Sequence, residues 1–293
     1  MKKVLILCIA AAMLMSFVAC STIEETALPS SASQATENSV SKHDFEEITV
    51  IDNEACTIKI TGIDPDNLWG YTLKAHLENK SADKTYMFSV EDAAVNGVCC
   101  SSLFAQEVAA GKKANSDISL SVDELQKNGI KDFTDIELSF RVYDSNDWTA
   151  DAVAHEAVHI YPYGEEKATK YEREVKDTDN VIIDNAYVSV IVTGYEKDTL
   201  FGYAVNLFLV NKTDKNIMFC VDEASVNGYM ADPFYAASVP GAKCRFSEMT
   251  WSSEALEKNG ITNIEEIEIL VRAYDNDNWF AEDLANQKVT LKP

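Results

Sequence analysis

Apolar and polar residues alternate with a period of two along much of this chain. Four apolar residues occupy every second position of the segment 136–142, and the segment 267–273 repeats the pattern. Because successive side chains of a β-strand point to opposite faces, this alternation predicts strands with one face in a core. Further strands are predicted between turn-forming residues, at 55–62, 68–78, 84–91, 98–108 and 115–121.

One short helix is predicted among these strands. Ser121 and Glu124 have the spacing of a capping box, Leu125 is placed to face inward, and Gly129 can supply the left-handed residue that ends a helix. Six or seven short strands and one helical turn within about 110 residues predict an antiparallel β-sandwich.

The predicted sandwich occurs twice. Five motifs recur in the same order, at an offset of 132 residues that falls to 131: IDN at 51–53 and 183–185, TG at 61–62 and 193–194, LWGY at 68–71 and LFGY at 200–203, NKS at 79–81 and NKT at 211–213, and VNG at 95–97 and 226–228. The fold class is therefore predicted to be all-β, with two tandem sandwiches that each contain one short helix.

The N-terminus has the pattern of a secretory signal, with Lys2 and Lys3 before an apolar run from Val4 to Met15. The following residues, FVAC, resemble the lipobox of bacterial lipoproteins, and this resemblance implies lipid attachment at Cys20. The expected location is the extracytoplasmic face of the cell membrane, with the membrane contacted through the N-terminal lipid.

The predicted organisation follows from the signal and the duplication. It comprises a signal peptide at 1–19, a Ser/Thr/Ala-rich tether at 20–44, the first repeat at 45–162, a charged linker at 163–180 and the second repeat at 181–293.

The segments ENKSADKTYMF, VNG, AAGKKAN, LQKNGI and DIELSFRVYD, with their counterparts in the second copy, resemble the immunoglobulin-like repeat lipoproteins of Gram-positive bacteria. The group is largely uncharacterised. Resemblance to it implies two immunoglobulin-like (Ig-like) sandwiches tethered outside the membrane. The resemblance implies no catalytic residues.

Charge excludes one class of partner. The formal net charge is -23, and the sequence contains no basic stripe that could neutralise phosphates. Nucleic acid is therefore not expected as a partner.

One motif suggests an enzyme. His155, Glu156 and His159 have the H-E-x-x-H spacing that binds zinc when it lies on a helix. Aligning the copies, however, places HEAVHIYP at 155–162 opposite NQKVTLKP at 286–293, which has the alternation of a closing strand. On a strand, residues four apart are separated by about 13 Å, too far to share one zinc ion. We therefore expect no catalytic site, no metal and no cofactor, with a zinc-dependent hydrolase as the less favoured alternative.

Two sets of residues are candidate binding sites. Acidic and amide side chains recur in one loop of each copy and could hold calcium, although such residues are also common in tight turns: Asp144, Asn146 and Asp147, with Asp275, Asp277 and Asn278. A second set could form a binding surface, unless each arginine simply pairs with a neighbouring acid: Arg141, Tyr143 and Trp148, with Arg272, Tyr274 and Trp279.

The cysteines do not define the fold, because none of the five beyond Cys20 is duplicated. Cys220 and Cys244 are the pair that could form a disulfide within one repeat; otherwise the thiols are small buried residues.

Together these features predict a non-catalytic binding or adhesion module whose edges or loops contact a surface protein or a glycan. A structural or accessory component of the cell envelope is the main alternative.

Overall fold

The computed structural model describes residues 45–293, except Trp279. The predicted signal peptide and tether, including the predicted lipid attachment site Cys20, lie outside the described residues.

The first repeat consists mainly of strands. Its elements are β1 (Ile48–Asp52), β2 (Cys56–Asp64), β3 (Tyr71–Asn79), β4 (Tyr86–Val95), β5 (Val98–Ser102), β6 (Ala105–Val108), β7 (Lys113–Ser121), α1 (Asp123–Lys127), β8 (Ile136–Asp144) and β9 (Ala154–Ile160).

The second repeat has the same elements in the same order, after a 3-10 turn in the linker at Glu165–Lys167. They are β10 (Asn180–Asp184), β11 (Val188–Thr199), β12 (Gly202–Asn211), β13 (Ile217–Val226), β14 (Tyr229–Met230), β15 (Ala236–Val239), β16 (Cys244–Trp251), α2 (Ser253–Lys258), β17 (Ile267–Asp275) and β18 (Ala285–Leu291).

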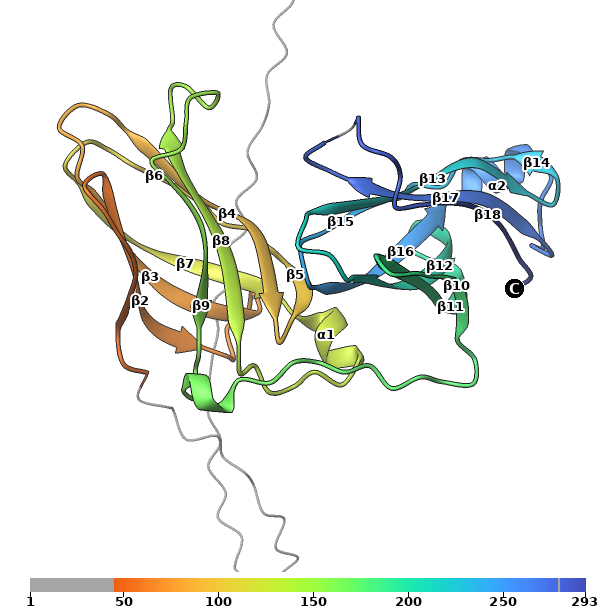
Figure 1. Ribbon diagram of the computed structural model, residues 1–293, viewed down its shortest axis with the longest axis horizontal. Coiled ribbons are helices and arrows are strands. Elements are labelled where there is room, and N and C mark those ends of the chain that lie inside the picture. Colours follow the sequence, from red (N-terminus) through yellow and green to blue (C-terminus); the bar gives the residue numbers. More distant parts are fainter. Residues whose placement is uncertain (1–44, 279) are drawn as a thin grey trace, which may run out of the picture. The chain divides into compact units, whose positions relative to one another are not determined.

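The strands of each repeat form two layers (Figure 1), and β5 pairs with β4, β7 and β16, so that one 13-stranded sheet runs through the first repeat into one layer of the second. In the first repeat β1, β2, β3 and β7 pair in that order, and β4 pairs with β6, β8 and β5, with β9 at the edge beside β8. In the second repeat β10, β11, β12 and β16 pair in that order, and β13 pairs with β14, β15 and β17, with β18 at the edge. The prediction of an all-β fold with antiparallel sandwiches is confirmed. Neither helix in the described part of the chain is long and apolar enough to cross a membrane.

The pairing register confirms the alignment of the two copies at their closing strands. Arg141 lies opposite His155 where β8 meets β9, and Arg272 lies opposite Asn286 where β17 meets β18. Residues 155–162 and 286–293 therefore have equivalent positions in the two sandwiches.

One strand was missed and two local expectations were wrong. The five-residue strand β1 was not predicted, because a register shift between Thr49 and Ile51 breaks the alternation. The single strand expected at 98–108 divides into β5 and β6, where Leu103 points to solvent and Phe104 into the core.

The capping box expected at Ser121 does not form. Ser121 belongs to β7, where it pairs with Ser101, so α1 begins only at Asp123 and has no side-chain cap. The other end of α1 is as expected: Leu125 is buried, and Gly129 has a φ of 85°. In the second repeat Ser252 does cap the helix, accepting a hydrogen bond from the Ala255 amide at 3.2 Å.

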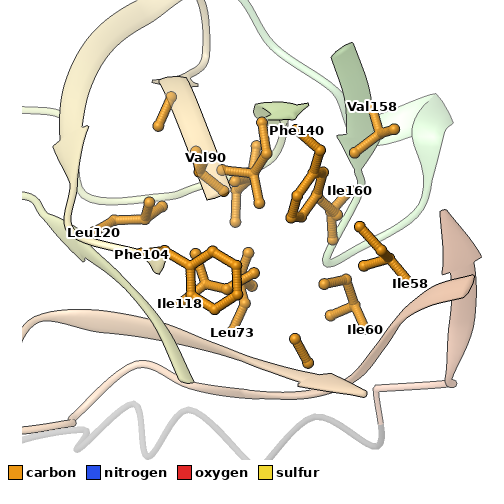
Figure 2. Packing of buried hydrophobic residues seen from close by; sticks show 14 of the residues in the cluster. Ile58, Ile60, Leu73, Val90, Phe104, Ile118, Leu120, Phe140, Val158 and Ile160 are labelled. Carbon is orange, nitrogen blue, oxygen red and sulfur yellow. The ribbon is translucent and has the colours of Figure 1, made fainter. Parts of the chain in front are cut away.

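The core of the first repeat lies between its two sheets (Figure 2). Ile58, Leu73 and Ile118 come from one sheet, and Phe140 and Ile160 from the other, and all five are fully buried. The second repeat has its own cluster, in which Trp251, Phe219 and Leu209 are equally buried. Burial of this kind contributes about 1.5–3 kcal/mol for each large side chain, so each repeat contains a substantial core.

The duplicated asparagines bind main-chain carbonyls in the turn after their own strand and at the end of strand β6 or β15. The side-chain nitrogen of Asn79, which is 1% exposed, donates to the carbonyls of Lys84 and Val108, both at 2.8 Å. Asn211 donates in the same way to the carbonyls of Lys215 and Val239. These bonds satisfy buried carbonyls that would otherwise destabilise the fold.

The IDN motifs join the two sheets of each sandwich. The side-chain nitrogen of Asn53 donates to the carbonyl of Val153 at 3.1 Å, and that of Asn185 donates to the carbonyl of Leu284 at 3.0 Å. Lys80 and Lys212 extend this contact, because each places its ammonium 2.6 Å from the aspartate of the motif, Asp52 or Asp184.

The VNG motifs form the hairpins β4–β5 and β13–β14. Asn96 and Gly97 both have positive φ, as do Asn227 and Gly228. Two consecutive left-handed residues form the type I′ turn that suits a two-residue hairpin, and Asn-Gly is its preferred pair.

The linker is ordered by a buried ion pair. Both guanidinium nitrogens Nη1 and Nη2 of Arg173 donate to the Asp179 carboxylate at 2.6 Å, and both side chains are almost fully buried. The linker also contacts both repeats, since the Tyr171 amide donates to the carbonyl of Asn96 and the Tyr171 ring packs edge-on against Phe208. The described residues 45–293 accordingly belong to one compact unit.

We expect Asn79→Ala to lower the free energy of unfolding by about 3 kcal/mol, because it removes two hydrogen bonds and leaves the buried carbonyl of Val108 without this donor. Chemical denaturation measures this change. Asn115→Ala is the control, because its side chain bonds only with His76 on the exposed face. Equal stability of the two variants would contradict the structural role of the duplicated asparagines.

We expect the stabilisation from Arg173 to depend on pH. Hydrogen bonding to Arg173 lowers the pKa of Asp179 from 3.8 to about 2. A lowered carboxyl pKa stabilises the folded state above about pH 4, and the effect is lost as the pH falls towards 2. Arg173→Met should therefore destabilise by about 3 kcal/mol at pH 7 and by much less at pH 2. A difference that stays constant in denaturation curves across this range would contradict the assignment.

Candidate functional site

The H-E-x-x-H segment lies on the edge strand β9, not on a helix. Its two histidines are exposed, and they lie opposite Arg141 and Glu137 of β8. The prediction that this segment is a strand is confirmed. At about 3.3 Å per residue, the two imidazoles are held roughly 13 Å apart along β9.

Each histidine has carboxylate partners of its own. The Nε2 atom of His155 lies 2.9 Å from Glu91, whereas the Nδ1 atom of His159 lies 2.7 Å from Asp135. The Nε2 atom of His159 is also 3.5 Å from Glu137. The two rings therefore belong to separate polar contacts on the exposed face of the sheet.

The predicted binding surface of the first repeat is brought together around Arg141. Its guanidinium lies 4.3 Å from the centre of the Tyr143 ring, and its Nη2 atom donates to the main-chain oxygen of Trp148 at 2.9 Å. The Trp148 side chain is exposed. Glu91 lies 3.7 Å from Arg141 and also contacts His155, so one carboxylate links the arginine to β9.

The equivalent arginine of the second repeat is more strongly neutralised. Arg272 lies over Tyr274 at 5.4 Å and pairs with both Asp283, at 2.8 Å, and Asp222, at 3.1 Å. These hydrogen bonds raise the pKa of Arg272 and lower that of Asp283. Trp279, the last member of the predicted surface, lies outside the described residues.

The candidate calcium residues serve as turn and ion-pair partners. Asp144 accepts from the Asn146 amide at 3.1 Å and lies 3.3 Å from the Lys84 ammonium; the hydrogen bond from Asn146 is the larger cause of its lowered pKa. Asp147 accepts from the hydroxyl of Thr149 at 2.7 Å.

The second loop is built similarly. Asp275 accepts from Lys215 at 2.7 Å and from the Asp277 amide at 3.1 Å, and the Asn278 amide donates to the main-chain oxygen of Asp275. Between residues 45 and 293, leaving out Trp279, no three His, Cys, Asp or Glu side chains are grouped closely enough to share a metal ion.

The five described cysteines are free thiols, so Cys220 and Cys244 are not joined. Burial raises the pKa of Cys56 and Cys99 to about 11 and that of Cys244 to about 12. Protonated thiols are weak nucleophiles. Cys56, Cys99 and Cys244 are small buried residues, whereas Cys100 and Cys220 are partly exposed.

The two VNG hairpins differ in a way that was not predicted from the sequence. In the first repeat β5 is covered, because Val98 pairs in parallel with Cys244 of β16, and the Cys244 amide donates to the Gly97 carbonyl at 3.0 Å. Val98 and Cys99 are buried, and Cys99 belongs to the hydrophobic cluster of the second repeat.

In the second repeat the equivalent strand β14 pairs only with β13 among the described strands. Tyr229 and Met230, the counterparts of Val98 and Cys99, are 54% and 68% exposed. A signal for this difference exists in the alignment, where a large aromatic and a flexible thioether side chain replace two smaller residues that are buried in the first copy.

Comparisons with known proteins show no established family. No family model matches the chain, and no curated protein matches it. Among solved structures, the YadV chaperone aligns at 10% identity over 75% of this chain and 92% of its own, with a TM-score of 0.24. The 7S globulin of Momordica charantia aligns at 7% identity over 71% and 76%, with a TM-score of 0.13. Scores this low support no assignment, so the all-β class rests on the strand pairing itself.

We expect the double substitution of His155 and His159 by alanine to leave the zinc content of the purified protein unchanged, because the two imidazoles cannot share one ion on a strand. Mass spectrometry of the metal content measures this. The matched control replaces Asn286 and Thr290, their counterparts in β18. Stoichiometric zinc that disappears only from the histidine variant would overturn the expectation of a non-enzymatic protein.

Proposed function

We propose that this protein is a non-catalytic binding module formed by two Ig-like sandwiches and carried on the extracytoplasmic face of the cell membrane by a lipid on Cys20. The anchoring and the location are supported by the signal and lipobox pattern of the N-terminus. The absence of catalysis is supported by the β9 strand, which separates the histidines of the one enzyme-like motif.

The observation that carries the binding role is the exposed β13–β14 hairpin. In its counterpart β4–β5, strand β5 pairs with the edge strand β16 of the other repeat through a main-chain bridge from Val98 to Cys244, and Val98 and Cys99 are buried. Tyr229 and Met230 offer the same hairpin edge with more contact area, and tyrosine and methionine are enriched in protein interfaces. A protein is therefore a better candidate partner than a glycan.

The partner is expected to present a β-sheet with an apolar outer face, as β12 and β16 do with Phe208 and Phe246. The first repeat of a second copy offers no such face. At the positions equivalent to these two phenylalanines it has His76 and Asn115, which bond to each other. The proposed partner is thus a different protein of the cell surface.

The test uses residues 45–293, immobilised and exposed separately to detergent-solubilised envelope proteins and to a glycan array. We expect a retained envelope protein whose affinity falls at least about tenfold when Tyr229 and Met230 are both replaced by serine, because anchors at the centre of an interface typically contribute 2 kcal/mol or more.

The matched control replaces Leu200 and Phe201 by serine, since this apolar pair is also exposed in the second repeat but lies in the β11–β12 turn. Equal loss in both variants, or binding to glycans alone, would contradict the hairpin as the binding edge.

A further inference from the structure

A groove of about 370 Å³ lies on the outer face of the second repeat, between the linker and strands β11, β12 and β16. Its apolar lining includes Ile191 of β11, Phe208 and Val210 of β12, and Val175 of the linker. Its volume is within the range of sites for small molecules.

The apolar floor of this groove is not required by the fold. Ile191, Phe208 and Val210 correspond in the strand register to Lys59, His76 and Glu78 of the first repeat. Those polar residues form the same strands, with Lys59 paired to Glu47 and Glu78 paired to Lys113. The two copies therefore have the same sheet but opposite surface chemistry.

The linker covers only part of this floor. The Tyr171 ring packs edge-on against Phe208, and the Arg173 guanidinium lies 5.4 Å from the centre of the same ring, so Phe208 is buried. Ile191 and Val210 remain partly exposed, and Val175 is largely exposed. An apolar strip is thus left open beside the linker.

Every charged side chain that lines the groove is a cation, although acidic residues outnumber basic ones 48 to 25 in the chain. These cations are Lys170, Arg173, Lys212 and Lys243. Carboxylates outside the lining pair with three of them: Asp179 with Arg173, Asp184 with Lys212 and Glu137 with Lys243.

Lys170 differs from the other three cations. Its ammonium donates to the carbonyl of Ala242 at 3.3 Å, and among the described residues no carboxylate lies within ion-pairing distance of it. The rim of the groove therefore retains positive charge in a strongly acidic protein. A cationic rim above an apolar floor complements a molecule with an aliphatic body and an anionic end.

We propose that this groove binds a free anionic amphiphile, of the class of medium-chain aliphatic carboxylates. The aliphatic chain lies along Ile191, Val210 and Val175, and the carboxylate is bound at Lys170 with Lys212 beside it. A bilayer surface is the less suitable source of this chemistry, because the groove is concave and a bilayer presents a flat face.

The test measures binding of decanoate to residues 45–293, which belong to one compact unit, by isothermal titration calorimetry. We expect Lys170→Glu and Ile191→Lys each to weaken decanoate binding at least about tenfold. The second substitution introduces the residue that the first repeat has at the same position, so the strand is expected to form normally. Decyltrimethylammonium, which has the same chain and the opposite charge, is expected not to bind.

The matched control compares Lys212→Gln with Lys80→Gln. Both lysines make the same 2.6 Å contact with the aspartate of an IDN motif, but only Lys212 lines the groove. Similar stability of the two variants with weaker decanoate binding only in Lys212→Gln supports the proposal. Any one of four results would overturn it. The wild type does not bind decanoate, or it binds the cationic amphiphile equally well. Ile191→Lys leaves decanoate binding unchanged, or the protein binds anionic vesicles but not free decanoate.

Discussion

Both sandwiches depend on asparagine side chains that bind main-chain groups where no strand can pair them. Two sheets packed face to face leave unpaired carbonyls and amides at every turn between strands, and a buried unpaired group costs free energy. Asn79 donates to two carbonyls and Asn211 to three, and Asn53 and Asn185 each donate to a carbonyl near the start of the closing strand. The motifs that the copies share are thus explained by the requirements of the fold.

The residues in which the copies differ are explained by what covers each surface. The outer face of β2, β3 and β7 carries ion pairs and needs no cover, whereas the equivalent face of β11, β12 and β16 is apolar and is partly covered by the linker, with β5 paired beside β16 at the edge of the sheet. An exposed apolar sheet is a risk for aggregation, so partial cover by Tyr171 and Arg173 protects it. The same cover leaves the groove beside Ile191.

Much of the fold could be predicted from the sequence, because side chains on a sandwich strand alternate between core and solvent. This rule located β8 and β17 and, through the alignment of the copies, identified β9 as a strand despite its helical motif. It failed where the backbone departs from regular pairing, as at the register shift in β1 and at Ser121, whose strand pairing displaces the start of α1.

The candidate sites were less predictable, since they depend on residues that are distant in the chain. Arg141, Tyr143 and Trp148 are close in sequence, and the structure does bring them together. Lys170, Lys212 and Lys243 are dispersed among acidic residues, and only the folding of the linker onto the second repeat places them around one groove. No window of the sequence shows a basic cluster there.

A duplicated chain contains its own reference for separating structural from functional residues. A residue present in both copies at the same hydrogen bond, such as Lys80 and Lys212, is accounted for by the fold, even if one of the two also lines a groove. At some positions the copies differ although the strand register is the same: Ile191 replaces Lys59, and Tyr229 replaces Val98. The fold does not require such a difference, so a contact must explain it. For Val98 that contact is β16 of the same chain. Ile191 packs against the hydrophobic cluster but stays partly exposed, and Tyr229 is 54% exposed, so both positions have surface left for a ligand. The histidines of β9 already have carboxylate partners in Glu91 and Asp135.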